Sequence, residues 1–234
     1  MHKNQDELKE IILSKGCYNN EENLRIYNKF FKDWFNNHTY IYNRFKIKDS
    51  FRILDIGCGP GHNLIHFNPD SVGIEMNDYL IDFGKKLGLN IIKTNIEEDL
   101  PVINGKFDLI WCTDFLVHMV SPFRFLFKIR DYLNNGSYIF IQIPQPSILG
   151  THKSPEHFYS FNKEDLIFLL KASGYKIVDS SGYVRRMPNC LNKIFEPLLQ
   201  RFGTNIWILA KKINIQVFQT NPFCHHGFIN QSIL

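Results

Sequence analysis

The stretch FRILDIGCGPG, residues 51–61, decides the fold. A short apolar run in it predicts a strand buried on both faces of a parallel sheet: Ile53, Leu54 and Ile56. Glycine follows at alternate positions, where a residue without a Cβ allows positive φ and close approach of the backbone to a ligand: Gly57, Gly59 and Gly61. Asn63 and Leu64 open a predicted helix, whose first N–H groups would be free to face an anion.

An acidic residue ends the next predicted strand. The stretch SVGIEMN predicts a strand over Val72 to Ile74 that ends in Glu75. An acid at the end of the second strand of a βαβ unit is placed to accept hydrogen bonds from ribose hydroxyls. The glycine spacing is G-x-G-x-G, whereas a dinucleotide pyrophosphate loop has G-x-G-x-x-G. This difference argues against a nicotinamide-dependent oxidoreductase, which stays an alternative.

From about Ile53 through Lys211 the chain resembles the class I S-adenosylmethionine-dependent methyltransferases. The matching stretches are LDIGCGPG, VGIE, NIEEDLP, FDLIWCTDFLVHM and EHFYSFNKEDLIFLLKASGY. The resemblance implies an α/β, Rossmann-like fold with helices on both faces of a seven-stranded sheet of order 3-2-1-4-5-7-6, the seventh strand antiparallel. It also implies S-adenosylmethionine as cofactor and S-adenosylhomocysteine as product.

Three parts are expected along the chain: an N-terminal helical cap at 1–50, a methyltransferase domain at 51–212 and a C-terminal tail at 213–234. A formal net charge of +4 without a run of Lys and Arg argues against a nucleic-acid partner. The five cysteines are scattered without a C-x-x-C pair, which indicates neither a zinc site nor a disulfide framework. A polar start and the lack of a long apolar run favour the cytoplasm. The oligomeric state stays open.

The cap is expected to contain two helices, Asp6 to Leu13 and Glu21 to Phe35. An apolar stripe follows the second one at helical spacing: Leu24, Tyr27, Phe31, Trp34 and Phe35. Two interpretations stay open, an aromatic face docked on the core or a lid that keeps water from the cofactor. The lid candidates are Tyr18, Tyr27, Tyr40 and Tyr42.

The later elements alternate as in an α/β chain. Predicted helices are Asp78 to Leu87, Ser121 to Leu133 and Lys163 to Ala172, the second stopped by Asn134, Asn135 and Gly136. Predicted strands are Asn90 to Lys93, Phe107 to Cys112, Tyr138 to Ile143, Tyr175 to Asp179 and Ile206 to Lys211. Arg185 to Phe202 is expected to be an insertion that shapes the acceptor pocket or an oligomer contact.

Ligands of open α/β sheets bind outside the carboxyl ends of the strands. The residues predicted to bind the cofactor there are Asp55, Gly57, Cys58, Gly59, Gly61, Glu75, Met76, Asn95, Ile96, Thr113 and Asp114. By resemblance, Asn95 stands where an Asp usually contacts the adenine amino group, and the N–H of Ile96 meets a ring nitrogen. Cys58 is expected to be a small filler between two glycines, and Asp55 either pins the glycine turn or belongs to the site.

Two histidines are the candidate catalytic residues. His118 follows the fourth strand, where relatives often carry a Glu-His pair and this chain has Val117 in place of the Glu. His157 lies in the loop after the fifth strand, and a neutral imidazole can take a proton from a hydroxyl. The expected reaction is in-line O-methylation of a small molecule or sugar, such as a quinone precursor. A non-catalytic binding or regulatory protein of the same fold is the alternative. No metal site is expected, and Cys224, His225 and His226 belong to the tail.

Overall fold

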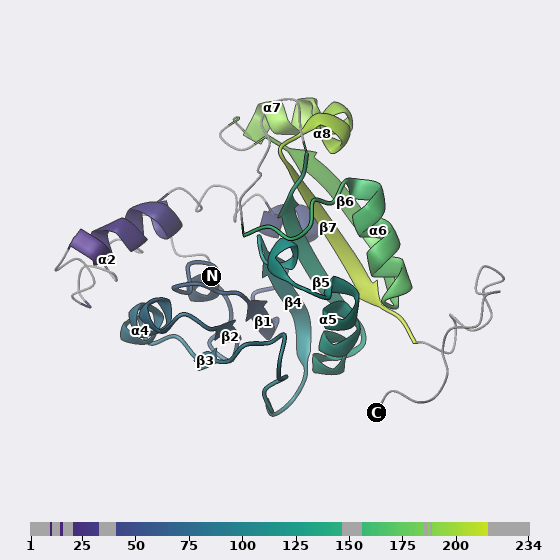
Figure 1. Ribbon diagram of the computed structural model, residues 1–234. Helices are drawn as coiled ribbons and strands as arrows, with labels where there is room; N and C mark the ends of the chain where they lie inside the picture. Colours follow the sequence, from purple (N-terminus) through teal and green to yellow (C-terminus); the bar gives the residue numbers. More distant parts are fainter. Residues whose placement is uncertain are drawn as a thin grey trace.

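The computed structural model describes residues 21–32, 41–146, 156–184 and 189–214, together with Glu10, Lys15 and Met187. Within these ranges one seven-stranded sheet has the order β3-β2-β1-β4-β5-β7-β6 (Figure 1). The strands are β1 Ile53–Ile56, β2 Val72–Glu75, β3 Ile91–Lys93, β4 Phe107–Thr113, β5 Leu133–Pro144, β6 Tyr175–Tyr183 and β7 Asn205–Lys212. β7 pairs antiparallel with both β5 and β6, and the pairs among β1 to β5 are parallel. The predicted strand order and the antiparallel β7 are confirmed.

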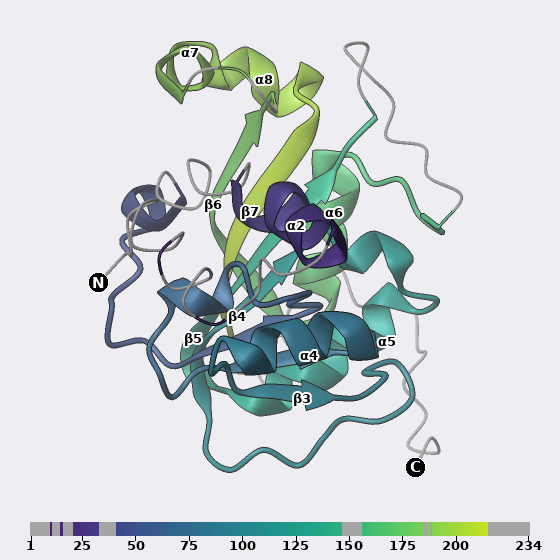
Figure 2. The same ribbon diagram turned by 90° about the vertical axis from the view of Figure 1, so that its left-hand side faces the viewer.

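Helices cover both faces of the sheet (Figures 1 and 2). On one face α5 (Pro122–Ile129) and α6 (Lys163–Ala172) bury Phe125, Leu126 and Leu166 against the strands. On the other face α4 (Asp78–Lys86) and the segment 41–47 complete a second cluster around Trp111 and Phe140. β1 is buried along its whole length because it lies between these two layers, as its apolar sequence predicted.

Two local predictions were wrong. The helix expected after the glycine turn is only the 3-10 turn η2, Leu64–His66, since Pro69 follows closely and a proline disfavours helix in the residue before it. The helix expected up to Leu133 ends at Ile129, and a second 3-10 turn, η4, spans Arg130–Tyr132. The predicted stop at residues 134–136 is instead the start of β5, where Gly136 has a φ of 84°.

The N-terminal segment docks on the core beside α4. It consists of α2 (Glu21–Ile26) and the π-helical turn η1 (Tyr27–Lys32), and Figure 2 shows α2 above α4. Phe31 is buried and contacts Phe83 of α4 at a ring-centroid distance of 5.8 Å. Tyr42 is buried between Phe67 and Trp111, so it is a core residue and the lid prediction for it was wrong.

Several predictions lie outside the described residues. These are the helix at 6–13, the lid candidates Tyr18 and Tyr40, the aromatic residues Trp34 and Phe35, and the tail with Cys224, His225 and His226. Among the described helices, none combines the length and the apolar character needed to cross a bilayer.

The insertion between β6 and β7 folds into two short helices, α7 (Asn189–Ile194) and α8 (Glu196–Phe202). They lie at the end of the sheet where β6 ends and β7 begins (Figure 1). Because β6 runs in the same direction as β5, this is also the edge at which the parallel strands end. The insertion therefore lies on the side of the molecule where α/β sheets bind their ligands.

Candidate active site

The glycine loop has the backbone that its sequence predicted. Gly57, Gly59 and Gly61 have φ values of 67°, 55° and 83°, in the left-handed region that favours glycine. Its N–H groups, however, already donate within the protein. Those of Gly57 and Cys58 both donate to the carbonyl of Ile74, at 2.9 and 3.0 Å, and that of Gly59 donates to Glu75. These three N–H groups are therefore not free donors, and the loop instead contributes a backbone that a ligand can approach closely.

Glu75 is fixed at the end of β2 by backbone donors on two sides. Its Oε2 accepts from Gly59 N at 2.9 Å, and its Oε1 accepts from Met76 N and Asn77 N at 2.8 and 2.9 Å. A carboxylate offers about four acceptor positions, so these bonds orient the group and leave capacity for a further donor. The predicted ribose acceptor is thus held in place against the glycine loop before any ligand arrives.

Asp55 is fully buried in β1, and within the described residues neither of its carboxylate oxygens accepts a hydrogen bond. Burial, and then the charge of Glu75, raise the pKa of this carboxyl group well above its usual range. A buried polar group without partners costs stability, so such groups commonly serve a ligand. The orphaned oxygens suit a cation with N–H donors, such as the ammonium group of an amino acid.

The side chain of Cys58 is packed in the interior beside the glycine loop. Its thiol is buried, donates weakly to the carbonyl of Gly59 at 3.5 Å, and would lie 2.6 Å from a Cβ placed on Gly73. Burial raises the pKa of the thiol well above its usual range, with the charges of Asp55 and Glu75 adding to the effect. A thiol in this environment stays protonated and unreactive.

A small cavity joins five of the residues predicted to bind the cofactor: Gly57, Glu75, Met76, Asn95 and Ile96. Ile74, Thr94 and Phe115 complete its wall. The volume is about 30 Å³, room for about two water molecules at roughly 10–15 Å³ each. The flexible, 63% exposed Met76 and the ring of Phe115 border this small space.

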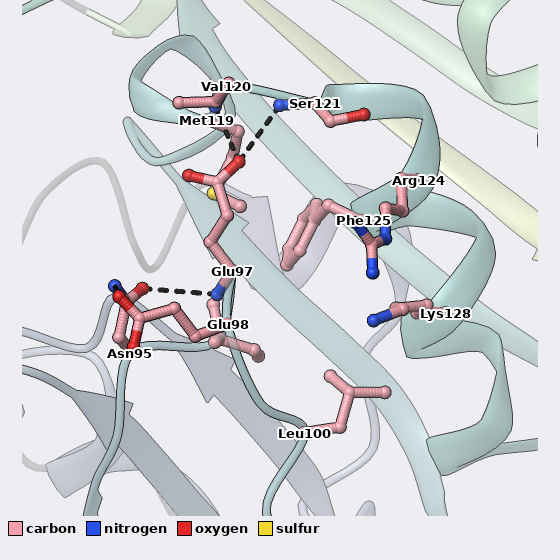
Figure 3. Close-up of a pocket in the computed structure, with 11 residues that line it drawn as sticks. Asn95, Glu97, Glu98, Leu100, Met119, Val120, Ser121, Arg124, Phe125 and Lys128 are labelled. Carbon is pink, nitrogen blue, oxygen red and sulfur yellow. Dashed lines mark hydrogen bonds between the residues drawn. The ribbon is translucent and has the colours of Figure 1, made fainter.

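A larger cavity of about 300 Å³ continues beyond Asn95 and Ile96, between this turn and α5 (Figure 3). On one side Glu97 accepts the N–H groups of Val120 and Ser121 at 2.7 and 2.9 Å. From the other side Arg124 and Lys128 extend toward the turn. The carboxamide of Asn95 binds Glu98 at 2.8 Å through Nδ2 and accepts from Glu97 N at 3.2 Å. Its predicted adenine contact would therefore have to replace or share these bonds.

The end of β4 carries the other two residues predicted on the cofactor side. The hydroxyl of Thr113 accepts weakly from Nδ2 of Asn63 at 3.4 Å. Asp114 has a φ of 51°, which is unusual for a residue with a Cβ. Gln142 on the neighbouring strand supports this conformation, because its carbonyl accepts from Asp114 N at 2.8 Å and its Nε2 lies 3.4 Å from Asp114 Oδ1. Strained backbone of this kind is concentrated at functional sites.

The two candidate catalytic histidines lie together. The ring centroids of His118, in the 3-10 turn η3 (Leu116–His118), and His157 are 4.8 Å apart in an edge-to-face contact. Nδ1 of His118 lies 2.9 Å from the carbonyl oxygen of Glu156. Since a carbonyl only accepts, Nδ1 carries the proton in the neutral ring and Nε2 keeps its lone pair. His118 thus has the tautomer that a general base needs at Nε2.

Three residues that lie beside the predicted site residues were not anticipated from the sequence: His62 beside Gly59, Phe115 beside Gly57 and Gln142 beside Asp114. Phe115 fills the space that a side chain at Gly57 would need, since a Cβ placed on Gly57 would lie 2.4 Å from Cδ2 of the ring. His62 follows the last loop glycine directly, and its ring lies 5.4 Å from that of Phe30 in the N-terminal segment. The only sequence signal for the position of His62 was its place directly after the GCGPG loop. Among the described residues no cluster of His, Cys, Asp and Glu suits a metal ion.

A family model described as "Methyltransferase domain" matches residues 21–180. Among curated relatives, "Uncharacterized protein MJ0638" of Methanocaldococcus jannaschii is 31% identical over 179 residues, 75% of this chain and 76% of that protein. A "tRNA U34 carboxymethyltransferase" of Campylobacter fetus is 30% identical over 105 residues, 41% of this chain and 36% of that protein. A "Ubiquinone biosynthesis O-methyltransferase" of Shewanella pealeana is 26% identical over 98 residues, 38% of this chain and 42% of that protein. The chain thus matches less than half the length of the latter two.

A crystal structure of a "SAM dependent methyltransferase" from Archaeoglobus fulgidus has the same fold. Its TM-score is 0.61 at 21% identity, and the match covers 82% of this chain and all of that one. The cofactor of this family is S-adenosylmethionine, as the sequence predicted. Since the family model spans most of the chain, this chain belongs to the methyltransferase-domain family, the S-adenosylmethionine-dependent enzymes with a Rossmann-like fold.

Proposed function

We propose that this chain methylates a hydroxyl oxygen of a small molecule or sugar, using S-adenosylmethionine as the methyl donor. One observation carries the proposal. Asp55 and Glu75 lie at the carboxyl ends of β1 and β2, and the contacting pair His118 and His157 follows the neighbouring parallel strands β4 and β5, at the same edge of the sheet. Each pair has the groups that its half of the reaction requires.

At the cofactor end, the side chains have the chemistry needed to bind S-adenosylmethionine. Asp55 would bind the ammonium group of the methionine part, because its oxygens have no other partner among the described residues. Glu75 would accept from a ribose hydroxyl at the position that its three backbone donors leave free. Gly57 and its neighbours let the backbone approach the ligand closely.

At the acceptor end the protein has to align the hydroxyl and remove its proton. When bound, the cofactor supplies a methyl group already activated by the positive sulfonium, and the sulfur leaves with the bonding electron pair as a neutral thioether. His118 takes the hydroxyl proton at Nε2, while the carbonyl of Glu156 holds the proton at Nδ1. His157, packed edge-to-face on His118, either fixes that ring or serves as the base itself. Alignment of this kind supplies about 7–11 kcal/mol of the barrier reduction.

Titration calorimetry with S-adenosylmethionine tests the cofactor side. Glu75→Ala removes charge-assisted bonds worth about 1.5–3 kcal/mol, so affinity is expected to fall roughly 10- to 150-fold. Asp78→Ala is the matched control, because Asp78 is an exposed acid three residues away that pairs with Lys93. Equal affinities for Glu75→Ala and wild type would contradict the ribose contact. Binding of a nicotinamide dinucleotide in place of S-adenosylmethionine would contradict the proposed function.

Release of S-adenosylhomocysteine with a panel of hydroxylated acceptors tests the reaction. His118→Gln is expected to lower turnover by about 10²-fold or more with unchanged cofactor affinity. The wild-type rate should rise with pH, since only a neutral imidazole can accept the hydroxyl proton. His157→Gln distinguishes the two roles, since a supporting ring leaves the shape of that pH profile unchanged. Cofactor binding without product from any acceptor would favour the non-catalytic alternative.

A further inference from the structure

The insertion between β6 and β7 carries an exposed apolar stripe. Its members recur at three- and four-residue spacing along α7 and α8, with exposed fractions between 38% and 67%: Leu191, Ile194, Phe195, Leu198 and Phe202. We call these side chains the outer stripe, and their spacing is that of residues on the side of a surface helix that meets an apolar environment. A contiguous apolar patch on a protein surface commonly marks an interaction site.

The opposite side of the two helices is fastened to the protein. Asn192 is 5% exposed, donates to the carbonyls of Val184 and Met187, and accepts from Val184 N. Leu199 is 4% exposed, and Nε2 of the buried Gln145 donates to the carbonyl of Gly203, directly after α8, at 2.8 Å. The stripe therefore cannot turn inward to bury itself without breaking these contacts. It projects from the end of the sheet (Figure 1).

The charges of the insertion favour an anionic partner. The sequence of α7 and α8 contains one acid, Glu196, which is neutralised by Arg44 at 2.6 Å. The same two helices contain the basic residues Lys193, in the last turn of α7, and Arg201 of α8. Basic residues on helices with an apolar face are the composition of helices that lie in the interface of an anionic bilayer.

The area of the stripe is too small for a stable dimer. A standard interface buries about 800 Å² on each partner, whereas five partly exposed side chains offer only some hundreds of Å². A lipid surface requires no complementary partner shape and accepts a narrow apolar stripe on basic helices. We propose that the outer stripe docks on the surface of an anionic lipid bilayer.

Docking would place the carboxyl edge of the sheet, and with it the active site, next to the bilayer. The inference does not depend on the proposed reaction, because it rests on the exposed face of α7 and α8 alone. If the chain methylates a small molecule, docking on a bilayer would give the active site access to lipid-soluble acceptors.

Co-sedimentation of the full chain with vesicles tests the proposal. Vesicles of equal parts phosphatidylglycerol and phosphatidylcholine should pellet the protein, and vesicles of phosphatidylcholine alone should pellet much less. The double substitution Ile194→Asn and Leu198→Asn should weaken partition by about tenfold or more, since both side chains project from the stripe. The matched control is Phe168→Asn on α6, because Phe168 is 74% exposed but lies outside the stripe.

The possible results distinguish binding of the stripe to a lipid bilayer from binding to a second copy of the chain. No binding of wild type to anionic vesicles overturns the proposal, as does equal binding of the double variant. Light scattering is measured on the same samples. A concentration-dependent dimer that the double substitution abolishes would overturn the proposal in favour of a second copy on the stripe. Unchanged cofactor binding by both variants confirms that they fold, so a loss of vesicle binding is not a loss of structure.

Discussion

Asp55 has opposite consequences for folding and for binding. Its pKa is raised well above 3.8, so above that pH the unfolded chain releases a proton that the folded protein still holds. Stability from this group is therefore lost as pH rises from about 4 through the folded pKa. The proposed contact would offset this cost, because an ammonium ion beside Asp55 favours the ionised carboxylate.

Asp55→Asn is expected to stabilise the fold at neutral pH and to weaken cofactor binding. Each unit of raised pKa corresponds to about 1.4 kcal/mol, and each kcal/mol to about 2–4 °C in melting temperature. The gain should shrink as the pH falls toward 4, whereas affinity for S-adenosylmethionine should fall about tenfold or more at pH 7.5. Thermal melts across pH and calorimetry measure the two effects. Unchanged affinity would show that Asp55 serves only the fold.

His62 is expected to make the protein acid-sensitive. Burial beside Phe30 and Phe31 lowers its pKa to about 3, from about 6.5 in an unfolded chain. The unfolded state therefore binds a proton between these values that the folded state does not. This contribution is fully present above about pH 6.5 and is lost as pH falls, by at most about 1.4 kcal/mol per pH unit.

The His62→Gln variant tests this, because glutamine does not titrate. Relative to wild type, its melting temperature should improve steadily from pH 6.5 down to pH 4. Asp55 has the opposite pH dependence in this range, so the comparison is made between variant and wild type at each pH. A constant difference across the range would show that His62 does not gain a proton on unfolding.

At the scale of elements, two glycines with left-handed backbone allow the cost of backbone strain to be distinguished from the cost of a steric clash. Gly57 and Gly88 have φ values of 67° and 79°. A Cβ on Gly57 would lie 2.4 Å from Phe115, whereas a Cβ on Gly88 would meet nothing within 4 Å. Alanine at either position has the left-handed cost of about 1–2 kcal/mol.

Gly57→Ala should therefore destabilise more than Gly88→Ala and, unlike it, weaken S-adenosylmethionine binding by about tenfold or more, because Phe115 is forced toward the cofactor cavity. Urea unfolding and calorimetry measure both effects. Adding Phe115→Ala to Gly57→Ala should recover part of the affinity. Equal binding by the two single variants would contradict a steric role for Gly57.

The elements that could be predicted from sequence are those with local signals. Asn162 and Gly174 delimit α6 as expected, since Asn162 accepts from Asp165 N and Gly174 has a φ of 84°. The helix predicted after the glycine loop failed because Pro69 overrides the apolar pattern before it. Hydrogen bonds between distant segments carry no local signal. The donation of Gly59 N to Glu75 was therefore not predictable, although both residues were predicted in the site.

At the scale of the whole molecule, the strand order came from resemblance to a family, because local patterns do not state which strands are neighbours. The proposed acceptor side was less predictable, since the loop after β5 and the insertion are connections between strands, where relatives of one fold differ most. His118 and His157, 39 residues apart in the chain, meet only in the folded protein.

One ion-pair cluster fastens the segment before the sheet to the far edge of the molecule. Arg44 binds Glu196 of α8 at 2.6 Å and Asp179 of β6 at 3.2 Å, and its side chain is 20% exposed. Burial alone would lower the pKa of Arg44, but the hydrogen bond and the charges of Glu196 and Asp179 outweigh it and raise the pKa. The guanidinium group thus stays charged and ties together residues more than 130 positions apart in the sequence.

Arg44→Met is expected to lower the free energy of unfolding by about 2–4 kcal/mol, because two partly buried carboxylates lose their partner. Lys93→Met is the matched control. The pair of Lys93 with Asp78 has the same distance of 2.6 Å, but its side chains are 57% and 73% exposed, so its loss should cost about 0–1 kcal/mol. Urea unfolding at low and high salt measures both, and only the Lys93 pair should weaken markedly with salt. Equal small losses would mean that the Arg44 cluster joins these segments without stabilising the fold.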